Sequence, residues 1–433
     1  MLGVSASSLL KWPIKASEAL IWALSIAVFF YLDFLDTILC MVYGFLDDHL
    51  EERTSPCCCE NRAKQGTFEG SDGEGEVSVT LHERRNIFRQ LGLSKLRKRR
   101  EVNGEKGFRT EPRWSDCDCG SCVSWKGNDE QKLHLVVKEP LQGLTEERTE
   151  NVIFLHGFLS SSSWWTETVF PNLSESSKSK FRLFAFDLLG FGESPKPSDS
   201  LYTLKDHLEM IEKSVIEPFE LDSFHIVAHS MGCVITMALA AKYRNSVKSV
   251  TLVAPPYFTS TKENESQNAL NRLAERRVWP PQLFGASVMS WYEHLGRCVC
   301  FIVCRNHRIW EWLLKLFSRK RELHFMVVDL TRHTHHSSWN TMHNVLCGGA
   351  KLLDGYLEVL KQSKIPVTVV HGDRDLVIPV ECGYNVKAKV PLTELRIIPN
   401  ADHRTVIMGR EKVFTRDLEE IWCSSAEQHK KKL

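Results

Sequence analysis

The stretch VAHSMGC at residues 227–233 decides the fold of this chain. An apolar run at residues 224–228 leads into the stretch, and an Ala-rich run at residues 234–241 follows it. This pattern predicts a buried strand, a sharp turn and a helix. A turn of this kind is a nucleophile elbow, and Ser230 would stand at its tip.

The residues on either side of Ser230 are small, as a tightly packed elbow requires. Ala228 and Gly232 lie two positions before and two positions after the serine. The usual pattern is G-x-S-x-G, so Ala228 departs from it while keeping a small side chain. Such a short match is common by chance, and the prediction therefore depends on partners elsewhere in the chain.

A predicted strand at residues 151–155 leads into the candidate oxyanion loop, formed by His156, Gly157 and Phe158. Gly157 would let the backbone turn, so that the N–H of Phe158 points at negative charge developing on a substrate. The second donor would be the N–H of Met231, which follows the nucleophile. We expect His156 itself to brace the loop through side-chain hydrogen bonds.

The loop after a predicted strand at residues 366–370 carries the candidate catalytic acid. Gly372 and Asp375 supply the G-x-x-D spacing that is typical of the acid loop in folds with a nucleophile elbow. Asp373 is the alternative acid, and a turn-stabilising carboxylate would be its other role. The sequence predicts Asp375 as the acid.

His403 follows the last predicted strand, at residues 394–398, and is the candidate general base. The chain then presents its candidate residues in the order Ser, Asp, His. A hydrogen bond from His403 to Asp375 would fix the tautomer of the imidazole and stabilise its protonated form. His403 could then take the proton of Ser230 and return it to the leaving group.

Further apolar runs at residues 133–138, 182–186 and 248–254 predict strands, and residues 204–219 have helical spacing. Strands alternating with helices predict a mostly parallel sheet with helices on both faces. Together with the elbow they predict the α/β-hydrolase fold with an inserted helical cap. Asp187 opens a D-x-x-G-x-G-x-S string after one strand and is expected to hold that loop by local hydrogen bonds.

Changes in composition divide the chain into five predicted segments. They are an N-terminal hydrophobic signal or signal-anchor segment (1–50), a Cys-containing and largely disordered linker (51–128), a first part of the hydrolase core (129–256), a helical cap (257–350) and a second part of the core (351–433). The cap is dense in aromatic residues, which would fill its own core or shape a pocket for an apolar group.

The N-terminal segment has Lys11 and Lys15 before an apolar run at residues 19–32, with acidic residues further on. This distribution predicts a cytosolic N-terminus with the rest of the chain across the membrane. Asp33 and Asp36 are costly in a membrane span. The alternatives are therefore a signal peptide, a signal anchor, and a buried or interfacial helix attached to the catalytic domain.

The linker contains a Gly- and acid-rich stretch at residues 70–75 and a basic run at residues 93–100, which favour disorder. The triplet Cys57–Cys59 is a palmitoylation candidate if it is cytosolic and a disulfide candidate if it is not. The C-x-C-x-x-C spacing of Cys117, Cys119 and Cys122 resembles a zinc motif, yet no second ligand pair lies at a standard distance.

No metal or cofactor is predicted. The cap histidines lack a well-spaced carboxylate partner, and three cap cysteines are expected to pack or pair there; these residues are His333, His335, His336, His343, Cys298, Cys300 and Cys304. His324 and Asp329 form an H-x-x-x-x-D string known from glycerolipid acyltransferases, but its place in the cap argues against that role.

Composition excludes some classes of function. The 433-residue chain has 43% hydrophobic and 25% charged residues, as globular proteins do. Its net charge of +1 argues against a nucleic-acid partner. Its 14 cysteines are many for a cytosolic enzyme and permit disulfides in an oxidising compartment.

The candidate residues predict acyl transfer through a serine nucleophile. Ser230 would attack an ester carbonyl, and water or an acceptor hydroxyl would resolve the acyl-enzyme. Hydrolysis and acyltransferase activity both stay open at this point, as does a thioesterase. A non-catalytic hydrolase-fold scaffold is the competing class. An epoxide hydrolase or dehalogenase would need Asp where this chain has Ser230.

The whole chain resembles the BODYGUARD family of plant α/β-hydrolases. The resemblance is carried by LCMVY at 39–43, WSDCDC at 114–119, FLHGF at 154–158 and VAHSMGC at 227–233. It implies a lysophospholipase-like hydrolase of the epidermal cell wall that is needed for cuticle formation. It also implies an extracellular acyl-ester or cutin-polyester substrate and no cofactor.

The family's functional residues correspond here to Ser230, Asp375 and His403. The expected location is the secretory pathway, with an extracellular, cell-wall or membrane-anchored product; the endoplasmic reticulum membrane is the alternative. The expected partners are the ester substrate and a membrane that the N-terminal segment contacts.

Overall fold

The computed structural model describes residues 11–51, 77–81, 86, 88, 91, 112–127, 131–141, 149–259, 269–270 and 290–430. The Cys57–Cys59 triplet, the Gly- and acid-rich stretch at 70–75 and the basic run at 93–100 lie outside these residues, and so the predictions made for them stay predictions.

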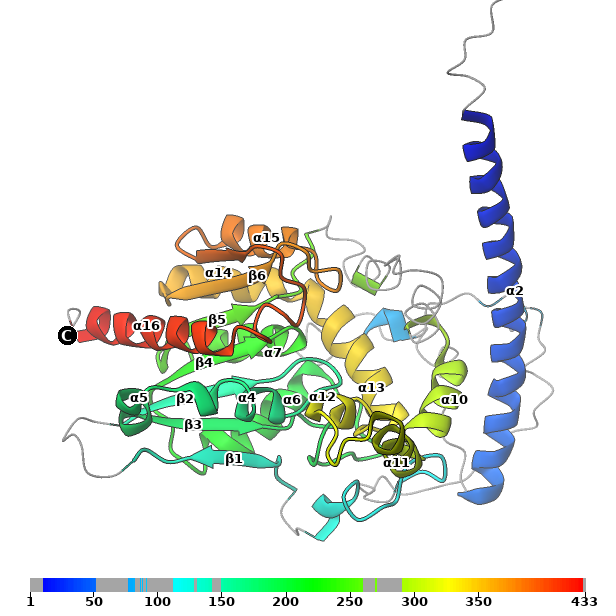
Figure 1. Ribbon diagram of the computed structural model, residues 1–433, viewed down its shortest axis with the longest axis horizontal. Helices are drawn as coiled ribbons and strands as arrows, with labels where there is room; N and C mark the ends of the chain where they lie inside the picture. Colours follow the sequence, from blue (N-terminus) through cyan, green and yellow to red (C-terminus); the bar gives the residue numbers. More distant parts are fainter. Residues whose placement is uncertain are drawn as a thin grey trace, which may run out of the picture.

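The described part of the chain is built around a seven-stranded sheet with strand order β1-β3-β2-β4-β5-β6-β7 (Figure 1). The strands are β1 (Leu135–Lys138), β2 (Glu150–Leu155), β3 (Phe181–Phe186), β4 (Phe224–His229), β5 (Val247–Val253), β6 (Val367–Gly372) and β7 (Glu394–Ile398). β1 is antiparallel to β3, and the other pairings are parallel. The predicted fold class, a mostly parallel α/β-hydrolase sheet, is confirmed.

Two hydrophobic cores lie on the two faces of this sheet. In β4, Ile226 and Ala228 belong to one core, and Val227 between them belongs to the other. This alternation follows from the two-residue repeat of a strand, and both faces are apolar because helices cover both.

One face is covered by α6 (Leu204–Ile211), α7 (Met231–Lys242), α14 (Leu353–Ser363) and α15 (Glu381–Lys389). The opposite face carries α4 (Ser163–Thr166), η5 (Phe170–Asn172) and α16 (Glu411–Lys430). Short α5 (Glu175–Lys180) precedes β3. The helix predicted at residues 204–219 is shorter in the structure, because α6 passes into the π-helical turn η6 (Glu212–Ile216).

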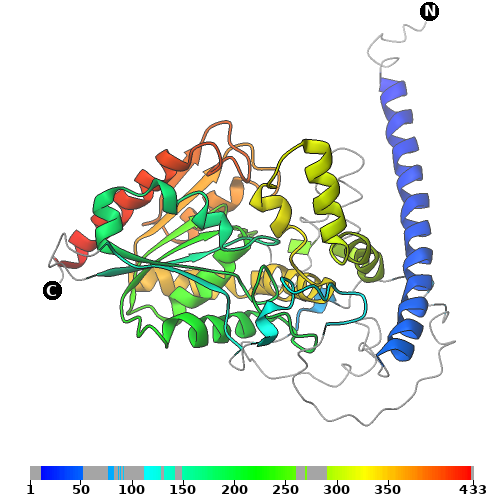
Figure 2. The same ribbon diagram turned by 60° about the horizontal axis from the view of Figure 1, so that its bottom comes forward.

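A group of helices follows β5 and precedes β6, as expected for an inserted cap (Figures 1 and 2). It contains α10 (Glu293–Val303), α11 (His307–Ser318), α12 (Phe325–Asp329), α13 (His335–Thr341), the π-helical η7 (Met342–Cys347) and η8 (Gly349–Lys351). The short helices η2 (Val79–Leu81) and η4 (Ser124–Gly127) come from the predicted linker. Ser78 of that region donates its backbone N–H to Asn344, which ties it to the cap.

The N-terminal helix α2 (Lys11–Leu50) stands beside the cap and extends past the body of the molecule (Figures 1 and 2). Its part from Ile26 to Leu50 is long and apolar enough to cross a membrane. Asp36 and Asp47 are nevertheless buried, because they face α10. The helix is therefore attached to the catalytic domain at its C-terminal half.

Candidate active site

Ser230 lies in the turn between β4 and α7, with φ 52° and ψ −120°. A residue with a Cβ rarely adopts positive φ, so this backbone is strained. Neighbouring segments hold it in place, because the Ser230 N–H donates to the Val253 carbonyl at 2.8 Å. The strand and helix predicted around this serine are both present.

The elbow has room for a methyl group at Ala228 but none at Gly232. A Cβ on Gly232 would lie 2.6 Å from the carbonyl oxygen of His156, which is closer than real Cβ atoms come. Ala228 is fully buried in the core and fits there. The departure from the usual motif is thus sterically harmless, whereas the second small residue is essential.

Ser230, His403 and Asp375 are joined by hydrogen bonds, although they lie far apart in the sequence. The Nε2 atom of His403 is 3.0 Å from Ser230 Oγ. The Nδ1 atom of His403 is 2.7 Å from Asp375 Oδ2. Each residue stands at the carboxyl end of a strand, β4, β6 or β7, or in the loop that follows it.

The Asp375 carboxylate is oriented by a second set of hydrogen bonds. Its Oδ1 accepts the backbone N–H groups of Val377 and Ile378, both at 2.7 Å. Burial would raise the pKa of Asp375, but hydrogen bonds from His371 and His403 outweigh burial and hold that pKa well below its ordinary value. The ionised carboxylate accepts only, so Nδ1 of His403 donates and Nε2 is left to accept from Ser230.

Asp373, the alternative acid, is exposed and lies outside this chain of hydrogen bonds.

Gly372 explains how the acid loop comes so near the histidine loop. A Cβ on Gly372 would lie 2.3 Å from the carbonyl oxygen of Ala401, and Arg374 N–H donates to that same oxygen at 2.9 Å. The two loops therefore pack backbone to backbone.

The oxyanion loop packs directly beside the nucleophile. A Cβ on Gly157 would lie 3.2 Å from the Cβ of Ser230, which places the loop containing Phe158 against the elbow. Met231 is the first residue of α7, where backbone N–H groups have no partner within the helix. These positions are compatible with the predicted donors, Phe158 and Met231.

His156 braces this loop, as predicted. Its Nδ1–H donates to the Gly157 carbonyl at 2.7 Å, and its Nε2 accepts the Leu188 N–H at 2.8 Å. The side chain is fully buried, and burial lowers the pKa of His156. A neutral ring with one donor and one acceptor satisfies both contacts.

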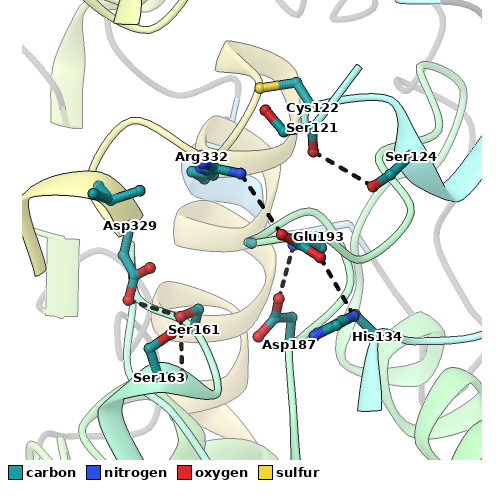
Figure 3. A network of polar contacts seen from close by, with 12 residues as sticks. Ser121, Cys122, Ser124, His134, Ser161, Ser163, Asp187, Glu193, Asp329 and Arg332 are labelled. Carbon is teal, nitrogen blue, oxygen red and sulfur yellow. Dashed lines mark hydrogen bonds and ion pairs between the residues drawn. The ribbon is translucent and has the colours of Figure 1, made fainter. Parts of the chain in front are cut away.

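Asp187 also has the bracing role that was predicted for it. It accepts the N–H of Ser162 at 2.6 Å and that of Glu193 at 2.7 Å. Figure 3 shows that the Glu193 carboxylate pairs in turn with His134 of the core and with Arg332 of the cap. The acid therefore organises the loops around the site and one edge of the cap.

His229 is a neighbour of the site that the sequence analysis did not single out. Its ring stacks on Trp164 with centroids 4.7 Å apart, and its Nε2–H donates to the backbone carbonyl of His403 at 3.0 Å. Burial, together with the nearby His403, lowers the pKa of His229 to about 3. A neutral His229 thus anchors the backbone that carries His403.

Asp329 of the cap reaches the same loops from the other side. Its Oδ2 accepts the Ser161 hydroxyl at 2.8 Å (Figure 3). Burial raises the pKa of Asp329 to about 7, although the Ser161 hydrogen bond opposes that change. His324 does not share this place, because its Nδ1 accepts the Met326 N–H at the start of α12. His324 and Asp329, the two ends of the H-x-x-x-x-D string, therefore have separate structural roles.

Comparison with known proteins agrees with this architecture. Residues 150–408 match the family profile described as "alpha/beta hydrolase fold". The Arabidopsis thaliana protein named "Probable lysophospholipase BODYGUARD 4" is 51% identical, over 96% of this chain and 100% of its own length. "Probable lysophospholipase BODYGUARD 5" is 46% identical over 96% and 98%, and "Probable lysophospholipase BODYGUARD 1" is 41% identical over 94% and 97%.

The chain belongs to the BODYGUARD family of α/β-hydrolases. The resemblance drawn from the sequence is thereby confirmed. Because the similarity spans nearly the whole chain, it includes the N-terminal helix and the segment that joins it to the core. The protein is accordingly an enzyme of the carboxylic ester hydrolase class.

Proposed function

We propose that the protein hydrolyses acyl esters with Ser230 as nucleophile, His403 as general base and Asp375 as the orienting acid. The observation that carries the proposal is the continuous hydrogen-bonded chain, 2.7 Å from Asp375 to His403 and 3.0 Å from His403 to Ser230. The strained backbone of Ser230 supports it, since such strain is concentrated at functional sites.

In the proposed reaction His403 Nε2 takes the proton of Ser230 as Oγ attacks the ester carbonyl. The N–H groups of Phe158 and Met231 stabilise the resulting oxyanion, an effect worth about 3 kcal/mol for one donor. His403 then protonates the leaving alcohol, and an acyl-enzyme remains. A water molecule, deprotonated by His403, attacks the acyl carbonyl and releases the fatty acid and Ser230.

The proposed substrate is an acyl ester of a lipid, either a lysophospholipid or a cutin polyester. The names of the relatives support the first of these, since each is named "Probable lysophospholipase". The resemblance to the BODYGUARD family supports the second and, with it, a role in cuticle formation outside the cell. Acyl transfer to a hydroxyl would use the same Ser230 intermediate.

We further propose that the protein works at a membrane. Two apolar surfaces support this proposal. One is the span-length part of α2. The other is α11, where Trp312 and Phe317 are 62% and 80% exposed and Arg319 follows the helix. Exposed aromatic residues next to basic ones are typical of helices that lie in the lipid–water interface.

The experiment that tests the reaction compares wild type with Ser230→Ala. Wild type should react covalently with a fluorophosphonate probe and hydrolyse a lysophospholipid, a p-nitrophenyl ester or a cutin oligomer. Ser230→Ala should lose labelling and at least about a thousandfold in rate, because the nucleophile is gone. Ser424→Ala, which changes an exposed serine on α16, is the matched control. A wild type that neither labels nor turns over any ester would overturn the proposal.

A further inference from the structure

Three cysteines of the 112–127 segment meet a histidine of the cap away from the candidate active site. Cys117, Cys119 and Cys122 face His307, the first residue of α11. One ligand atom from each of the four lies within 4.8 Å of all the others. Three thiol sulfurs and one imidazole nitrogen form a donor set that suits a tetrahedral zinc ion.

The distances between the ligand atoms fit such an ion. Zn–S bonds of about 2.3 Å and Zn–N bonds of about 2.0 Å place tetrahedral ligand atoms about 3.5–3.8 Å apart. His307 Nε2 lies 3.3 Å from Cys119 Sγ and 3.4 Å from Cys122 Sγ. Both sulfurs therefore face the same ring nitrogen at nearly the separation that a shared zinc ion imposes.

The other nitrogen of His307 is held as metal-bound histidines require. Its Nδ1 is 2.8 Å from Glu311 Oε1, one turn further along α11. A carboxylate on Nδ1 keeps the proton there and leaves the Nε2 lone pair to face the sulfurs. Carboxylate, histidine and metal form a recurrent arrangement in zinc sites, and here the first two are present in the right order.

The cysteine segment has a compact turn at the same place. The N–H groups of Cys122 and Val123 both donate to the Cys119 carbonyl, at 2.9 and 3.1 Å. This turn brings two sulfurs of a C-x-x-C pair to one side. Cys117, Cys119 and Cys122 take part in no disulfide in the described part of the chain, so their sulfurs are not used in that way.

A second cluster lies near the first. Cys300 and Cys304 approach His333 Nε2 at 3.7 and 3.6 Å, and a small cavity is lined by Cys117, Cys122 and His333. This second group offers three ligands, one fewer than a closed structural zinc shell needs. The four-ligand cluster carries the inference.

We propose that Cys117, Cys119, Cys122 and His307 bind one zinc ion that fastens the 112–127 segment to the cap. The ion would cross-link residues up to 190 positions apart, and four protein ligands would leave no open coordination position for chemistry. Its role is therefore structural and separate from Ser230. The sequence alone predicts no metal here, because the fourth ligand lies in another segment and motif spacing covers only ligands that are near one another in the sequence.

The first test measures metal in the purified full-length chain. Wild type should contain one more zinc per chain, by elemental analysis, than the variant Cys119→Ser/His307→Ala. Replacing zinc by Co²⁺ should give the visible bands of a tetrahedral thiolate site. His307→Cys should retain the metal, since four cysteines also bind zinc. Cys423→Ser, which changes an exposed cysteine on α16, should retain it as well.

A second measurement on wild type keeps the test valid if a variant fails to fold. A mercurial thiol reagent should release the zinc in step with modification of Cys117, Cys119 and Cys122, located by peptide mass mapping. Equal zinc content in wild type and double variant would overturn the proposal. So would a disulfide among these cysteines in the native protein, zinc release that follows other cysteines, or iron with acid-labile sulfide in place of zinc.

Discussion

At the scale of single residues, the candidate site depends on the two carboxylate oxygens of Asp375, which have different partners. Oδ1 of Asp375 is occupied by two backbone N–H groups, and Oδ2 faces Nδ1 of His403. The two backbone hydrogen bonds to Oδ1 therefore keep the carboxylate from rotating, and only Oδ2 faces the imidazole of His403. This arrangement selects one tautomer of His403, and the tautomer decides whether Ser230 can lose its proton.

Asp375→Asn should lower kcat for a p-nitrophenyl ester by about ten-thousand-fold. The asparagine oxygen would keep the two backbone N–H groups, so its NH₂ group would face His403 Nδ1 and force the wrong tautomer. Asp373→Asn, an exposed change in the same loop, should leave kcat close to that of wild type. The reverse ranking of these two variants would show that Asp373 is the acid.

The sequence indicates best which distant residues meet where a motif ends a strand. Ser230, Asp375 and His403 each follow an apolar run, and parallel strands bring such ends to one edge. The roles of His229 and Asp329 could not be predicted in this way, because their partners are a backbone carbonyl and a serine of a distant segment. The contact between Cys119 and His307 could not be predicted either, since it joins segments 188 positions apart.

At the scale of elements, the bounds of the strands were predicted to within one or two residues, whereas the helices of the cap could be located only from the structure. Strand periodicity is local, but cap helices are defined by what they pack against. The cap meets the core through α12, where Asp329 binds Ser161, and through Arg332, which lies 3.8 Å from Glu193 (Figure 3). A buried carboxyl at such a junction makes the attachment sensitive to pH.

The contribution of Asp329 to the stability of the fold should fall as pH rises towards 7. Its pKa rises from an ordinary 3.8 to about 7, mainly through burial. Between these values the folded chain keeps a proton that the unfolded chain has lost, so folding is favoured at the acidic end. Measured by urea unfolding, Asp329 should contribute on the order of a few kcal/mol less to the free energy of unfolding at pH 8 than at pH 5.

The contribution of Asp329 is isolated by Asp329→Asn, which cannot ionise. Between pH 5 and pH 8 this variant should lose less unfolding free energy, or gain more, than wild type does, whereas Asp373→Asn, an exposed change, should behave as wild type. An unchanged pH dependence in Asp329→Asn would mean that the carboxyl titrates near its ordinary value in the folded chain.

At the scale of the whole molecule, three distant segments meet around Arg297 of α10. Its guanidinium donates to both carboxylate oxygens of Asp47 on α2, at 2.7 Å each. The guanidinium carbon lies 4.5 Å from the ring centroid of Tyr43 and 5.4 Å from that of Trp114. The Trp114 indole also donates to Asp47 at 2.6 Å. Arg297 thus couples the N-terminal helix, the 112–127 segment and the cap.

Arg297→Ala should destabilise the full-length protein by about 3–5 kcal/mol, because it leaves the Asp47 carboxylate buried without its partner. The free energy of unfolding would be measured by chemical denaturation in detergent. Asp47→Ala/Arg297→Ala should lose less than the two single changes combined, since neither charge then remains unpaired. The exposed pair Lys205–Glu209 provides the control, and Lys205→Ala should cost no more than about 1 kcal/mol. If Arg297→Ala cost as little as Lys205→Ala, α2 would not be held to the cap by this ion pair.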